Sequence, residues 1–425
     1  MVSGYILFII GIIIFFIRPR LVPLYYLLWT TMLIIICNML FPMTFEESNM
    51  VGHVHSTNYI WLCGLLTIAI HLKKLNKNEK IIVITLLCLF LYVFILGLSR
   101  GVLGAFQGWL RTFFCFVPLW FLVKYHNIKF ESYGNYIIYS FVIEFALVLF
   151  QTISGLYPSY TNGEYAENGA VNIVGTFRRY NEFADNMCLL ILSLIFIYYK
   201  KQNFIPKYIF FTFLAIGISL VAIAGARTEL AAIIVSLSVV IYFGFPQWRK
   251  KIFIVGLLGL IILGAGYRIS LEKDTSISAN ESNYNRQLQL LDFLEGEGDV
   301  TEESTLFLSV FLLGEYFSSP DNMLTGPGLL FTNINGYYGL VTVDYHRCDS
   351  FLALLLCETG IVGYIILISF LVLIIRNSKE KLFPIATLLY LLIISITDFG
   401  LFQGYSAIYW LLIVSYSKPL SKKNK

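Results

Sequence analysis

Long apolar segments alternate with short polar turns along nearly the whole chain. The apolar segments are about 15–25 residues long, and an α-helix needs roughly 20 apolar residues to cross the hydrocarbon core of a membrane. One polar interval, residues 269–350, is far longer than the other turns. The pattern predicts thirteen membrane-spanning helices, at residues 2–17, 21–41, 57–72, 81–98, 109–123, 135–153, 182–199, 208–226, 229–245, 252–268, 351–375, 383–398 and 402–416.

These spans predict an all-α polytopic membrane protein in which residues 1–425 form a single integral membrane domain. Residues 269–350 form a large outer, partly helical loop between the tenth and eleventh transmembrane helices. Within the loop, Ser282–Glu295 has helical spacing that leaves Arg286 off the apolar face. The apolar stretch Leu306–Phe317 is too short to span, so we expect a helix that lies on or dips into the outer leaflet.

Composition agrees with this class. Hydrophobic residues make up 58% of the chain and charged residues 13%, and the mean hydropathy is +0.75, whereas soluble proteins carry about 25% charged residues. No small-residue cleavage site follows the first apolar segment, which favours a retained helix over a signal peptide. The seven cysteines are scattered without a CxxC pair. This favours small core residues over a disulfide framework or a zinc site.

The basic residues divide between two sides of the predicted bundle. With thirteen alternating helices, 21 of the 30 basic residues fall on one side, which the positive-inside rule assigns to the cytoplasm. The N-terminus is then outside, the C-terminus inside and residues 269–350 outside. The outer side carries eight arginines and one lysine, namely Arg100, Arg111, Arg178, Arg179, Arg227, Arg268, Lys273, Arg286 and Arg347.

Arginine forks suit bidentate binding of phosphate or carboxylate groups. The alternative is that these arginines pair with nearby acids such as Glu182, Asp185 and Glu229. Glu144 lies near the middle of the sixth span, where a charge is costly unless it is paired, so we expect a structural partnership with an arginine. Asn181 is the expected N-cap of the seventh span.

Four short patterns resemble the O-antigen polymerase and O-antigen ligase superfamily of bacterial inner-membrane proteins. Gly175-Thr176-Phe177 followed by Asn181-Glu182-Phe183-Ala184 is similar to the family's Gly-Thr-Phe-x-x-x-Asn-x-x-Ala, and Ala224-Gly225-Ala226-Arg227 to its Ser-x-Ser-Arg. Arg286 followed by Gly326-Pro327-Gly328 resembles its Arg…Gly-x-Gly. Ser350-Phe351-Leu352 leading to Glu358-Thr359-Gly360-Ile361-Val362-Gly363 resembles its His-Asn-Ser-Tyr-Leu…Glu-x-Gly-x-x-Gly.

The resemblance covers roughly residues 170–375, and the first 130 residues share only the hydropathy profile. It departs from the family pattern where Cys348-Asp349 replaces His-Asn, with His346 two residues earlier. In the ligase branch that histidine is held to be catalytic, so its displacement favours the polymerase branch.

The resemblance implies a GT-C-like, metal-independent glycosyltransferase of the bacterial inner membrane that needs no cofactor. It would polymerise lipid-linked O-antigen or capsule repeat units, taking the glycan from undecaprenyl pyrophosphate. The implied partners are the lipid-linked oligosaccharide, membrane lipid, a flippase and a chain-length regulator, with no nucleic acid. Arg227 and Arg286 are expected to bind pyrophosphate, with Arg178, Arg179 and Arg347 as further candidates, and His346, Asp349 and Glu358 remain the alternatives for the base.

Two other functions remain open at this stage. A ligase would transfer the glycan to lipid A core, and the sequence does not encode the acceptor legibly. A transporter or flippase of lipid-linked sugars would carry charge along a central path through the bilayer. Here charge is sparse at depth and concentrated at the outer rim, which favours an enzyme.

Overall fold

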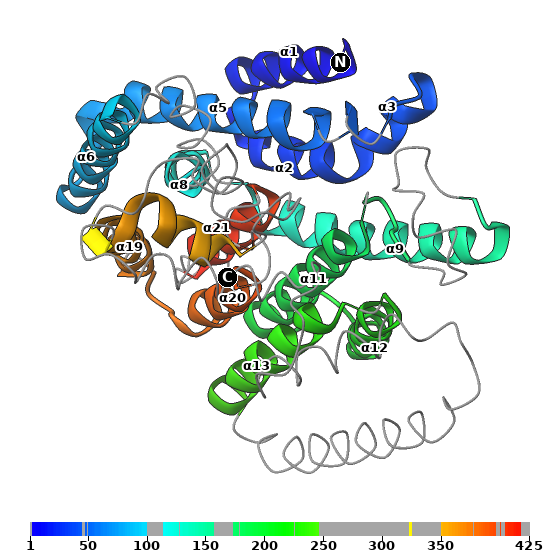
Figure 1. Cartoon of the computed structure of the whole chain (residues 1–425). Coiled ribbons are helices and arrows are strands. Elements are labelled where there is room, and N and C mark those ends of the chain that lie inside the picture. Colours follow the sequence, from blue (N-terminus) through cyan, green and yellow to red (C-terminus); the bar gives the residue numbers. More distant parts are fainter. Residues whose placement is uncertain are drawn as a thin grey trace, which may run out of the picture.

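The computed structural model shows a bundle of helices (Figure 1). It covers residues 2–44, 47–48, 50–99, 114–126, 128–156, 173–177, 179–224, 226–245, 323–324, 350–376, 378–396, 400 and 404–417. The helices are α1 (Val2–Ile17), η1 (Pro19–Leu21), α2 (Val22–Leu28), η2 (Trp29–Leu33), α3 (Ile34–Leu40), η3 (Met50–His55), α5 (Ser56–His71), η4 (Leu72–Lys74), α6 (Lys77–Ser99), α8 (Phe116–Tyr125), α9 (Phe130–Ser154), α11 (Tyr180–Lys200), α12 (Lys207–Ile223), α13 (Arg227–Gly244), α19 (Phe351–Arg376), α20 (Leu382–Ile394) and α21 (Gly404–Tyr416). No strand occurs among these residues.

Twelve of the thirteen predicted spans overlap a helix of the structure. Five helical stretches in the described ranges are long and apolar enough to cross a membrane: Pro19–Leu40, Lys77–Ser99, Phe130–Ser154, Tyr180–Lys200 and Thr359–Arg376. The predicted span 252–268 and the two helices expected within residues 269–350 lie outside the described residues. The fold is that of a helical membrane protein.

One predicted helix boundary is wrong. α11 begins at Tyr180 with Arg179 as its N-cap, so Asn181 lies inside the first turn. The Asn181 side chain instead accepts a hydrogen bond from the backbone N–H of Glu182, at 3.0 Å. Arg179 occupies the N-cap position with extended backbone angles, but its side chain makes no capping hydrogen bond.

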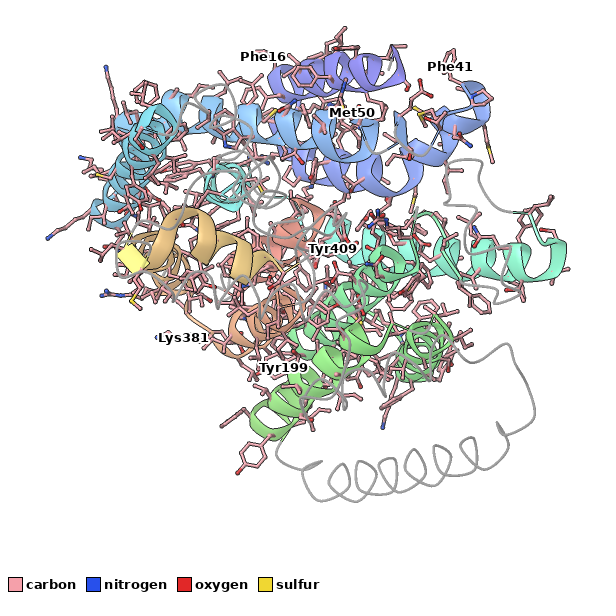
Figure 2. All side chains as sticks on the ribbon, viewed as in Figure 1. Phe16, Phe41, Met50, Tyr199, Lys381 and Tyr409 are labelled. Carbon is pink, nitrogen blue, oxygen red and sulfur yellow. The ribbon has the colours of Figure 1, made fainter. Side chains whose placement is uncertain are left out.

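Side-chain polarity is arranged as lipid requires. α9 exposes only apolar and aromatic residues along much of one face, among them Tyr139, Phe145 and Ile153, while Glu144 and Gln151 are buried on the other. A soluble helix shows the reverse arrangement. Phe16 and Phe41 lie at the periphery and Tyr409 near the centre (Figure 2). The exposed surface is therefore suited to acyl chains.

α8 and α21 lie near the centre of the bundle, between the N-terminal helices and the helices that follow α9 (Figure 1). α8 packs against both α5 and α21, and α21 packs against α11 and α20. α13 packs against α20 and α11 on the far side. Every described side chain of α8, except those of Lys124 and Tyr125 at its end, is buried. The N-terminal helices are thus held to the remainder through α8 and α21.

Several basic turns lie together at one end of the bundle, here called the basic end. Lys124 pairs with Glu79 and Lys200 pairs with Glu380. Lys201 lies 3.3 Å from Glu131. These pairs join the α5–α6, α8–α9, α11–α12 and α19–α20 turns, which the charge pattern predicts to share a side.

The α1–α2 turn and the end of α21 reach the same place. The backbone N–H of Glu380 donates to the carbonyl of Ser417, at 3.1 Å. The ring of Phe15 contacts that of His126, with centroids 5.9 Å apart. Burial, with nearby His71 and Arg20, holds the pKa of His126 below its ordinary value. The basic end therefore gathers all these turns on one face of the bundle.

The contact between α5 and α8 depends on a glycine, and this gives a first prediction. A Cβ at Gly64 would lie 2.6 Å from the backbone carbonyl carbon of Pro118. Because backbone has to move to make room, we expect Gly64→Val to destabilise the protein by about 1–3 kcal/mol. Thermal unfolding of the purified protein in detergent measures this. Ile70→Ala, at a lipid-facing position of α5 that is 62% exposed, is the control and is expected to change stability little. Equal melting temperatures for the two variants would contradict the prediction.

Candidate functional site

The segment Gly175–Phe177 is folded against α9 by two polar side chains. The Gln151 amide donates to the carbonyl of Gly175 at 2.8 Å and accepts from its N–H at 3.1 Å. Glu144 accepts from the backbone N–H of Thr176 at 3.0 Å and from its hydroxyl at 2.5 Å. Gln151 and Glu144 are seven residues apart on one face of α9. Together they satisfy buried backbone groups that lipid cannot hydrate.

Gly175 is required at this turn for two reasons. Its φ is +53°, in the left-handed region that disfavours side chains. In addition, a Cβ there would collide with Oε2 of Glu144 and would lie 2.6 Å from the ring of Phe183. The glycine thus lets the turn approach both α9 and the first turn of α11.

The predicted pairing of Glu144 with an arginine is not found in the described part of the chain. Glu144 is 1% exposed, and its partner there is Thr176. A buried carboxylate needs donors, and a backbone N–H together with a hydroxyl can supply them in place of a cation. The sequence could not distinguish these partners, because Thr176 is 32 residues away.

Asp185 is the centre of a second buried network. Tyr390 donates to its Oδ1 at 2.7 Å, and Tyr405 and Ser406 donate to its Oδ2 at 2.9 Å and 2.8 Å. The next residue along α11, Asn186, accepts a hydrogen bond from the hydroxyl of Tyr409 at 3.1 Å. Asp185 therefore joins α11 to both α20 and α21 through hydroxyl groups, where an arginine partner was the alternative.

A narrow pocket lies beside the Gly175–Phe177 turn. It is partly open to the outside, and its interior has room for about one water molecule. Its described lining residues come from both halves of the chain: Thr30, Ile34, Gly52, Thr176, Phe177, Glu182 and Tyr405. The rings of Phe177 and Tyr405 lie 5.8 Å apart. The lining thus combines hydroxyls, aromatic rings and one carboxylate.

The pocket lies far from the basic end. α11 has its C-terminus, Lys200, at the basic end and its N-terminus, Tyr180, next to the pocket, and a helix of this length spans roughly 30 Å. The start of α13 lies beside α11, because the thiol of Cys188 donates to the carbonyl of Glu229 at 3.7 Å. The start of α19 lies at the end of α20, where the N–H of Leu352 donates to the carbonyl of Ser395 at 3.1 Å.

These helix starts hold three of the segments singled out by sequence. Arg179 precedes α11, Arg227 is the first residue of α13, and Ser350 precedes α19. Helix N-termini carry partial positive charge and favour anions nearby. We call this the motif end, defined by Gly175–Phe177 and these three helix starts. Its backbone is suited to receive an anionic group.

The remaining predicted site residues are placed only in part. Glu358 lies in α19, two residues before a kink at Gly360 with φ of 62°, and the side chains of Arg227 and Glu358 lie outside the described set. Arg178, Arg286, His346, Arg347 and Asp349 lie outside the described residues. In the described ranges, no group of three or more His, Cys, Asp or Glu side chains is arranged to hold a metal ion.

Sequence reasoning missed most of the polar residues that the structure brings together. Gln151 and Thr30 were not singled out, and in the alternative interpretation Glu182 and Asp185 were expected to pair with arginines. One signal was available: Glu144 and Gln151 repeat at helical spacing within an apolar span. No family model and no curated protein matches this chain.

The Glu144–Thr176 contact gives a second prediction. Thr176→Val keeps the shape of the side chain but removes the hydroxyl that donates to Glu144. The buried carboxylate then loses one of its two donors, and we expect a loss of about 1–3 kcal/mol in stability. Thr176→Ser, which keeps the hydroxyl, is the matched control and should retain most of the stability. Thermal unfolding in detergent compares the two, and a valine variant as stable as the serine variant would argue against the contact.

Proposed function

We propose that the protein polymerises lipid-linked oligosaccharide repeat units, of the O-antigen or capsule type. It transfers the glycan from undecaprenyl pyrophosphate to a lipid-linked acceptor unit at the outer face of the bacterial inner membrane. One observation carries the proposal. The Gly175–Phe177 turn is built into the membrane bundle by Glu144 and Gln151, beside a pocket and at the end where α11, α13 and α19 begin.

The distribution of basic turns supports this placement. If the basic end faces the cytoplasm, as the positive-inside rule requires, the motif end and its pocket face outward. α1 then begins outside and α21 ends inside, which puts the N-terminus in the periplasm and the C-terminus in the cytoplasm. Lipid-linked repeat units are extended on that outer face in the family that the sequence resembles.

The lipid-facing surface supports the choice of substrate. Large apolar side chains of α1, α6 and α9 are exposed, such as Phe16 at 70% and Ile153 at 78%. An undecaprenyl tail can remain among the acyl chains while its pyrophosphate lies at the interface. The substrate then meets the motif end without leaving the membrane.

The chemistry requires little from the protein beyond charge and orientation. A bond forms between the acceptor oxygen and the anomeric carbon, and the bond from that carbon to the pyrophosphate oxygen breaks. The acceptor proton passes to a base, and the electron pair leaves with the pyrophosphate. Arg227 and Arg286 stabilise the negative charge that develops there, with Arg178, Arg179 and Arg347 as further candidates. His346, Asp349 and Glu358 are the candidate bases.

Arg227 provides the test of this function. We expect Arg227→Ala to lower polymerisation by about 100-fold or more, the usual cost of removing one group that stabilises transition-state charge. Membrane insertion should be unchanged. Cells carrying the variant would then show surface glycan limited to single repeat units on a gel. Lys207→Ala, at an exposed basic position that begins α12 at the basic end, is the control and should keep the full ladder.

The outcomes separate the candidate functions. Single repeat units in a strain that lacks this chain indicate a polymerase, whereas bare lipid A core indicates a ligase or a flippase. An unchanged ladder in that strain excludes all three. Long chains in the Arg227→Ala strain would contradict the role of Arg227 with pyrophosphate.

A further inference from the structure

The N-terminal helices supply part of the pocket at the motif end. Thr30 and Ile34 come from η2 and the start of α3, and Gly52 comes from η3. The four other described lining residues belong to the Gly175–Phe177 turn, α11 and α21. The family resemblance gives no role to this part of the chain. The N-terminal helices and the motif end therefore line the pocket together.

Two of these three N-terminal residues, Thr30 and Gly52, lie in π-helical turns. η2 (Trp29–Leu33) interrupts the helix between α2 and α3, and η3 (Met50–His55) leads into α5. A π-turn inserts one extra residue into a helix and is commonly found at functional sites, because it redirects side chains relative to the flanking turns. Two such turns on one pocket give that wall an irregular backbone.

A close contact fixes this wall relative to α21. A Cβ at Gly404 would collide with the hydroxyl oxygen of Tyr26, so only glycine allows α2 and α21 to approach this closely. Tyr26 is one helical turn before Thr30, and Gly404 is next to Tyr405. The contact therefore sets Thr30 and Tyr405 on the same pocket. On the other side, Gly52 allows the side chain of Ile34 to lie against it, since a Cβ there would be 2.7 Å from Ile34 Cδ1.

The pocket is matched in size and chemistry to one hydroxyl group. Its interior admits about one water molecule, which is too little for a sugar ring. Its lining offers the hydroxyls of Thr30, Thr176 and Tyr405 and the carboxylate of Glu182. A sugar hydroxyl carries one hydrogen, and the oxygen of a lining hydroxyl whose own hydrogen is donated elsewhere can accept it.

We propose that this pocket recognises a single hydroxyl of the lipid-linked sugar and that Thr30 makes it selective. The proposal rests on the proposed glycosyl-transfer function and adds a subsite to it. Thr30 donates its own hydroxyl hydrogen within the helix, to the carbonyls of Tyr26 and Leu27 at 3.2 Å each. Its oxygen lone pairs then accept a hydrogen bond from the sugar hydroxyl. The N-terminal helices thereby select which repeat unit is extended.

The adjacent residue provides a matched control. Thr31 is on the same π-turn, is buried like Thr30 and donates to the carbonyl of Leu27 at 2.7 Å, but it is not among the described lining residues. Thr30→Val and Thr31→Val therefore remove the same group from the same turn. Thr30→Ser restores the hydroxyl at the lining position.

The experiment uses the full-length protein in detergent with lipid-linked acceptor units, each lacking one sugar hydroxyl. Wild type is expected to elongate one of these deoxy acceptors poorly. Thr30→Val should lower kcat/KM for the complete acceptor about tenfold, chiefly by raising KM. With this variant, kcat/KM for the complete acceptor should be no higher than kcat/KM for that deoxy acceptor. Thr31→Val and Thr30→Ser should keep the wild-type preference. Thermal unfolding of each variant shows that the fold is retained.

Two results would overturn the inference, and they differ from each other. If wild type discriminates and Thr30→Val discriminates as well as Thr31→Val does, the subsite is wrong while glycosyl transfer stands. If wild type elongates no lipid-linked acceptor, the proposed function fails and the subsite fails with it.

Discussion

The hydrogen bonds from Thr176 to Glu144 are the interaction on which the motif end depends. A carboxylate in the middle of a membrane helix is costly, and so is a turn with unsatisfied backbone groups in lipid. Each removes the cost of the other, because Glu144 accepts from the N–H and hydroxyl of Thr176. Gln151 does the same for the backbone of Gly175. The Gly175–Phe177 turn therefore packs into the bundle against α9.

The position of the Gly175–Phe177 turn determines how the surrounding helices are arranged. Phe177 contacts the ring of Tyr405, and Tyr405 donates to Asp185, which also holds Tyr390. Through these contacts α11, α20 and α21 have one relative arrangement. Gly404 then brings α2 against α21, which places the N-terminal π-turn on the same pocket. A disturbance at Glu144 is thus expected to reach residues more than a hundred positions away in sequence.

Sequence alone could predict the features that depend on local pattern. Hydropathy located twelve helices near their observed positions, and charge predicted which turns gather at the basic end. It could not predict the partners of Glu144 and Asp185, because a buried carboxylate accepts equally well from arginine, hydroxyl or backbone donors at any sequence distance. The π-turn at Trp29–Leu33 could not be predicted either, because mean hydropathy is the same whether these residues form an α-helical or a π-helical turn. Asn181 was expected as the N-cap because of its residue type, whereas α11 begins at Tyr180 and Arg179 occupies the N-cap position.

The observed partners of the acids change how the outer arginines are interpreted. If every buried acid at the motif end needed an arginine, these arginines would be structural and little positive charge would remain for a substrate. Glu144 and Asp185 instead have hydroxyl and backbone donors in the described part of the chain, and neither draws on an arginine there. Among the described residues, these two acids therefore give no support to the structural explanation. Under the proposed function, the arginines in the sequence around the three helix starts of the motif end would then be available to bind pyrophosphate.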